Sequence, residues 1–216
     1  MPRGIWRAFA FLVVAGAVLA FWKAVGSNRM SEDADAKMKT MTVHVAIDEA
    51  TVSTATDAFS LIEPLWDRVD IYGSWGRYQA TLRPFTSSQR HLFAIQWYRS
   101  EVNNGGHDQF FGNSTGIVWE HAVEGLQAIG LLDAATILKS ASDRLGGASR
   151  DRTEREAQLE AAQADFDDLD DRFFELEKTG AFDQKMLTFA RQHSADFRFN
   201  GTVERVVLPP LGERPN

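Results

Sequence analysis

Apolar residues between Asp57 and His193 recur three or four positions apart, which is the periodicity of amphipathic helices. Polar cap residues precede these repeats and Gly or Asn residues follow them, so that the pattern divides into separate segments. It predicts helices over approximately 57–69, 86–102, 114–129, 133–145, 154–177 and 183–193. The expected fold is therefore all-α, a compact bundle of about six helices.

The most regular pattern lies in residues 154–177. A capping box at Thr153–Glu156 would begin this helix and Gly180 would end it. The spacing predicts one continuous helix with a single apolar seam, formed by Leu159, Ala162, Phe166, Leu169, Phe173 and Leu176.

Other parts of the chain lack this periodicity. Residues 71–85 predict a loop with little regular structure. The prolines after Asn200 predict an irregular tail, to which the valines from Val203 onward could add one short strand. The predicted division is an N-terminal hydrophobic segment 1–26, a polar linker and lead-in 27–55, a helical domain 56–200 and a tail 201–216.

The N-terminal segment contains an unbroken apolar run, Ala8–Trp22, preceded by Arg3 and Arg7. With its flanks, residues 5–25 predict a single membrane-anchoring helix, and Trp6 and Trp22 would lie at the two interfaces. Two alternatives stay open. The segment could be a signal peptide cleaved near Gly26, which would export the protein. A downstream start codon would remove it and leave a cytoplasmic protein, beginning at Met30, Met38 or Met41.

Charge and composition narrow the function. The 216 residues include no Cys, which excludes disulfides, thiolate nucleophiles and cysteine metal sites. The net charge of −7 divides unevenly, because residues 1–40 carry +3 and the remainder carries −10. Such a body repels nucleic acid and attracts basic proteins.

Negative charge is densest in residues 154–177, which hold ten acidic and two basic side chains. In a helix this is about one carboxylate per 3.6 Å, close to the phosphate spacing of about 3.4 Å along one DNA strand. Charge runs are usually solvated outer faces, but this run lacks the positive neighbours that stabilise ordinary exposed helices. The candidate partner-binding residues lie away from the apolar seam: Glu160, Asp167, Asp168, Asp171 and Glu175.

A second unusual segment is Glu101–Asn113, EVNNGGHDQFFGN. The structural interpretation is that its glycines turn the chain, its amides satisfy backbone groups and Phe110 and Phe111 enter the core. The functional alternative is an enzyme with a polar pocket around Asn104, His107, Asp108 and Gln109. The sequence contains no P-loop and no G-x-G-x-x-G motif, and it predicts no catalytic residue, metal site or cofactor.

This segment, together with AVEGLQAIG at 122–130 and LDDRFF at 169–174, resembles the bacterial DNA-mimic-protein family over residues 58–199. The resemblance implies an acidic helical domain without catalytic residues. It also implies a domain that can form a homodimer and occupy the DNA-binding face of a basic partner. Its signature turn comprises Asn104, Gly105, Gly106, Gln109, Phe110, Phe111 and Asn113.

The leading hypothesis is a non-catalytic acidic interaction protein that binds a basic, nucleic-acid-binding protein and does not bind nucleic acid directly. The two alternatives are the enzyme with the polar pocket and a membrane-tethered structural domain without mimicry.

Overall fold

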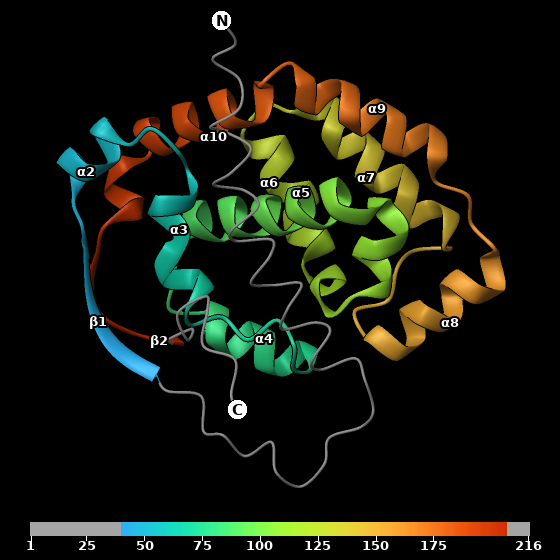
Figure 1. Cartoon of the computed structure of the whole chain (residues 1–216), viewed down its shortest axis with the longest axis horizontal. Coiled ribbons are helices and arrows are strands. Elements are labelled where there is room, and N and C mark those ends of the chain that lie inside the picture. The colour runs from blue at the N-terminus through green and yellow to red at the C-terminus, as the bar shows by residue number, and fades with distance from the viewer. Residues whose placement is uncertain (1–39, 207–216) are drawn as a thin grey trace, which may run out of the picture. The chain divides into compact units, whose positions relative to one another are not determined.

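The computed structural model describes residues 40–206, and within them Met41–Arg205 form one compact unit. This described part is mostly helical, with nine α-helices and one two-stranded sheet (Figure 1). In chain order the elements are β1 (Thr40–Ile47), α2 (Glu49–Thr54), α3 (Phe59–Trp66), α4 (Trp75–Leu82), α5 (Ser87–Gly112), the 3₁₀ helix η1 (Ser114–Val118), α6 (Trp119–Ala128), α7 (Leu132–Arg144), α8 (Arg152–Ala162), α9 (Asp167–Lys178), α10 (Ala181–Gln192), the 3₁₀ helix η2 (Ser194–Phe197) and β2 (Phe199–Val206).

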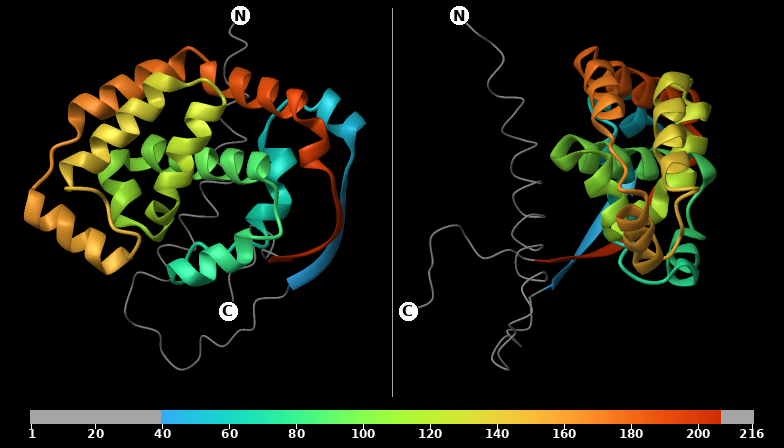
Figure 2. Two further views of the ribbon diagram at one scale, coloured as in Figure 1. Left: turned by 180° about the vertical axis from the view of Figure 1, so that it is seen from behind. Right: turned by 90° about the vertical axis from the view of Figure 1, so that its right-hand side faces the viewer.

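Helix α5 runs through the middle of this unit, and α3, α6, α8 and α9 all contact it (Figures 1 and 2). Its start is the predicted capping box, in which the Thr86 hydroxyl accepts from the Gln89 backbone and the Gln89 side chain accepts from the Thr86 backbone. Its apolar residues, including Leu92, Ile95 and Val102, are buried in a single hydrophobic core. The residues from Ser88 to Val102 are all buried or half-buried, so neighbouring elements cover this helix on several sides.

The predicted break at Gly105–Gly106 is confirmed as a kink inside α5. Gly106 has φ of 72° and ψ of −174°, a backbone conformation that is essentially restricted to glycine. The chain then resumes a helix up to Gly112, where the sequence predicted only a short connection. Phe110 and Phe111 in this last part are fully buried, as expected.

The structure corrects the fold prediction in two places that were expected to be irregular. Residues 71–85 contain α4, because the Ser74 side chain caps its first turn and Tyr78 and Leu82 bury one face. The lead-in before residue 56 contains β1 and α2, and β1 pairs with β2. The predicted short strand near Val203 is therefore real, although it begins earlier, at Phe199.

The largest correction concerns residues 154–177, which do not form one helix. Asp151 caps α8 in place of the expected Thr153 box, and α8 ends at Gln163 in the left-handed conformation with φ of 45°. Helix α9 begins four residues later and runs in another direction (Figure 1). The apolar spacing continues across the break, but Ala162 is exposed whereas Phe166 is buried.

The predicted anchor, residues 5–25, lies outside the described residues. Between residues 40 and 206 no helix is long and apolar enough to cross a membrane.

A candidate interaction surface on helix α9

Helix α9 carries six of the acidic side chains, and its inner face is bound to the kink of α5. Asp170 Oδ1 accepts a hydrogen bond of 3.0 Å from the backbone N–H of His107 and one of 2.5 Å from the His107 ring Nδ1. The other ring nitrogen of His107, Nε2, lies 2.9 Å from the hydroxyl of buried Tyr98. The kink leaves the backbone N–H of His107 without an acceptor within α5. Asp170 of α9 supplies that acceptor, as a capping residue does at the start of a helix.

Two turns further along the same face, Glu177 forms a bidentate ion pair with buried Arg99 of α5, at 2.7 and 2.9 Å. Arg99 also donates to Asp183 of α10 and lies over the Phe182 ring. Burial disfavours the charge of Arg99, but its bonds to Glu177 and Asp183 outweigh burial and raise its pKa. This pair joins α5, α9 and α10.

A third carboxylate of α9 is also used in folding. Asp168 forms a bidentate pair with Arg144 at the end of α7, at 2.6 and 2.7 Å. These hydrogen bonds lower the pKa of Asp168. Of the five predicted partner-binding residues, Asp168 is therefore held by a structural cation, and Glu175 is paired with Lys178 on the helix surface.

The remaining three candidates, Glu160, Asp167 and Asp171, are exposed. They make no hydrogen bond or ion pair through their side chains with any residue in 40–206. Asp167, Asp171 and Glu175 follow one another at intervals of four along α9, about 6 Å apart at helical rise. Glu160 is on α8, so it does not continue this row as the single-helix prediction required.

The residue that sequence reasoning missed is Arg155 of α8, which is fully buried. Its guanidinium donates to four backbone carbonyls, two of which belong to Phe111 and Asn113 at the carboxyl end of α5. Burial lowers the pKa of Arg155 to about 10. The negative end of a helix dipole favours a cation at this place. Only its position as one of two basic residues among the acids of 154–177 could have drawn attention to it.

The signature turn has a polar core of its own around the buried carboxylate of Glu101. Gln109 Nε2 and Asn113 Nδ2 both donate to Glu101 Oε2, at 2.7 and 2.8 Å, and Asn104 donates to Gln109. Only Asn103 donates to a backbone group, the Arg99 carbonyl. The prediction that these amides serve mainly to satisfy backbone groups is therefore wrong for Asn104, Gln109 and Asn113.

The residues of the alternative enzyme site do not converge on a reactive group. His107 is buried with both ring nitrogens bonded, whereas Asp108 and Asn104 are exposed. Nowhere in 40–206 do three His, Asp or Glu side chains group so that they could hold a metal ion.

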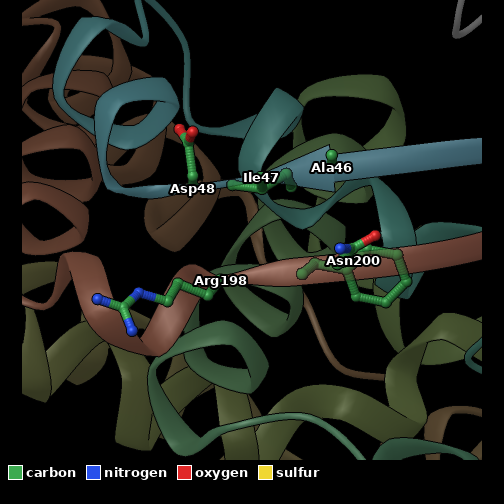
Figure 3. A pocket seen from close by; sticks show the side chains of 6 residues that line it. Ala46, Ile47, Asp48, Arg198 and Asn200 are labelled. Atoms are coloured by element: carbon green, nitrogen blue, oxygen red, sulfur yellow. The ribbon is translucent and has the colours of Figure 1, made fainter.

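A pocket of about 390 Å³ lies elsewhere, between the ends of β1 and β2 (Figure 3). Its charged groups already have structural roles, since Asp48 caps α2 and Arg198 pairs with Glu49. It is lined by Ala46, Ile47, Asp48, Arg198, Phe199 and Asn200. It therefore contains none of the residues of the signature turn.

Comparison with known families gives one match, the DMP19-like protein model, over residues 83–193. This is just over half of the chain. The chain belongs to the DMP19-like protein family. DMP19 is a family of DNA-mimic proteins, which are not enzymes. No curated protein and no solved structure matches the chain.

The family match begins after α4 and ends after α10, so it contains the kink of α5, Arg155 and the acidic helix α9. The elements β1, α2, α3, α4, η2 and β2 lie outside it. The contacts between the signature turn and α9 are therefore part of the DMP19-like domain itself. In this chain the turn contacts the helix that carries the negative charge.

Proposed function

We propose that this protein is a non-catalytic DNA mimic that presents the outer row of α9 to a basic, nucleic-acid-binding protein. The observation that carries the proposal is the division of carboxylates on α9. Asp170, Glu177 and Asp168 are bound to α5 and α7, and this leaves Asp167 and Asp171 exposed without a cation.

The rigidity of this row supports a binding role. Its helix is fixed by buried Leu169 and Phe173 and by ion pairs at both ends. Charges held in place before binding lose little conformational entropy when a partner arrives. The spacing of about 6 Å is wider than the 3.4 Å of phosphates along one strand, so the row alone imitates a sparser line of charge than the sequence suggested. A homodimer that places two such rows side by side would raise the density.

The test replaces Asp167 and Asp171 by Asn in the full chain. A basic partner is first isolated by pull-down at low salt, and its affinity for each variant is then measured at low and high salt. We expect the dissociation constant to rise about tenfold at low salt, and the difference to shrink at high salt, because exposed charges are screened. Thermal stability should be unchanged, since neither carboxylate has a partner in the fold.

A matched control removes two exposed carboxylates elsewhere, with Glu124→Gln and Asp133→Asn. It has the same net charge as the α9 variant and therefore separates a local surface from a general electrostatic attraction. Equal losses in the two variants would refute a binding surface on α9. Extension of the α9 variant by Glu160→Gln, Asp168→Asn and Glu175→Gln then measures the rest of the predicted set, with stability monitored because Asp168 holds Arg144.

A further inference from the structure

Four acidic or basic side chains, Arg99, Glu101, His107 and Arg155, are buried in the described part of the chain. Arg99 and His107 each contact a carboxylate, and Arg155 donates to four carbonyl oxygens. Glu101 and Arg155 have no partner of opposite charge among residues 40–206, but Arg155 donates to four carbonyl oxygens whereas Glu101 accepts from only two amides. A buried carboxylate is costly unless a cation or several donors compensate it.

The compensation that Glu101 receives is one-sided. The two amide donors, from Gln109 and Asn113, both bond Oε2. No residue in 40–206 donates a hydrogen bond to Oε1, and this atom keeps slight contact with solvent, since it is not one of the fully buried polar atoms without a partner. The nearest structural link to a cation is indirect, through Asn113, whose carbonyl accepts from Arg155 while its amide donates to Glu101.

The hydrogen-bond network of Glu101 extends through Gln109 to an exposed residue. Asn104, which donates to Gln109, is exposed at the kink of α5. Tyr72 is 53% exposed, and burial together with the charge of Glu101 raises the pKa of its phenol. The side chain of Glu101 itself is only 4% exposed.

We infer that Glu101 is a receptor for one cationic side chain, an arginine or lysine, that a basic partner inserts at the signature turn. A guanidinium or ammonium group donates several hydrogen bonds and accepts none, so it suits the free Oε1 and the exposed amide oxygen of Asn104. The amides of Gln109 and Asn113 hold the carboxylate in position before the cation arrives. This inference rests on the proposed function for its kind of partner, but it concerns a separate site.

The buried position makes this contact different from those of the α9 row. A charge pair formed in a desolvated setting is screened less by salt than an exposed one. The loss of affinity caused by removing the Glu101 charge should therefore be as large at high salt as at low salt. The loss caused by removing the α9 charges should become smaller at high salt.

The test titrates the full chain with a tetra-arginine peptide and, as the neutral counterpart, a tetra-citrulline peptide. Nuclear magnetic resonance follows the side-chain amide signals of Gln109 and Asn113. We expect both signals to move with the arginine peptide and to stay in place with the citrulline peptide. If they do not move with arginine, the inference is overturned, and this outcome needs no variant.

The matching variant is Glu101→Gln, which keeps the shape of the side chain and removes its charge. We expect it to weaken arginine-peptide binding about tenfold or more at low and high salt, while Glu124→Gln, an exposed neutralisation, has less than about a twofold effect. Equal affinities of Glu101→Gln and the native chain would overturn the inference. Loss of binding by Asp167→Asn/Asp171→Asn with no effect of Glu101→Gln would support the proposed function alone, and the reverse result would support this site alone.

Discussion

The replacement of Gly106 by Ala tests how the signature turn holds the acidic helix. Gly106 has φ of 72°, and a Cβ built on it would lie 2.2 Å from Oδ2 and 3.0 Å from Cγ of Asp170. That carboxylate would have to move away. It would then lose its bonds to the backbone N–H and the ring of His107.

The magnitude follows from these two effects. A non-glycine residue in this backbone region costs about 1–3 kcal/mol. The loss of hydrogen bonds to a charged acceptor costs about 1.5–3 kcal/mol more. The smaller entropy of the unfolded alanine chain offsets about 0.4–1 kcal/mol. We therefore expect Gly106→Ala to lower the free energy of unfolding by about 3 kcal/mol, a fall of about 6–12 °C in Tm.

Thermal denaturation followed by circular dichroism measures this change, and Gly146→Ala is its control. Gly146 has a similar φ of 74°, but nothing lies within 4 Å of its added Cβ. Gly146→Ala should lower the free energy of unfolding only by the cost of a positive φ in alanine, about 1 kcal/mol. A double-mutant cycle with Asp170→Asn should give less than additive losses, because both changes break the same contact. If Gly106→Ala and Gly146→Ala melt alike, Asp170 does not depend on the missing Cβ and the reasoning is refuted.

Three further outcomes are expected. Arg155→Lys should cost about 3 kcal/mol in denaturant unfolding, because one ammonium cannot reach the four carbonyls of the guanidinium, and an unchanged midpoint would contradict this. Burial lowers the pKa of His91 and His121 below the ordinary 6.5, so the unfolded chain binds protons first and stability should fall as pH drops below about 6.5. Melting at a series of pH values should show a weaker fall in a His91→Gln/His121→Gln variant, and an equal fall would contradict the assignment. The native full chain should fractionate with membranes through residues 5–25, and its recovery in the soluble fraction would contradict the anchor.

Local signals in the sequence predicted much of the fold. The capping box at Thr86 begins α5, and Gly130 and Gly180 follow helix ends with φ of 74° and 71°. These features depend on a few neighbouring residues, so a sequence suffices to find them. The break at Gly106 and the burial of Phe110 and Phe111 were predicted for the same reason.

The tertiary structure decided the break between α8 and α9 and the use of each carboxylate. An apolar repeat of three and four residues is the same whether or not the chain turns, and Gln163 carries no sequence signal for its left-handed conformation. Asp168, Asp170 and Glu177 bond to residues 24, 63 and 78 positions away, so no local pattern distinguishes them from Asp167 and Asp171. The sequence thus determined that the protein is acidic and helical, while packing against α5 and α7 determined which charges remain for a partner.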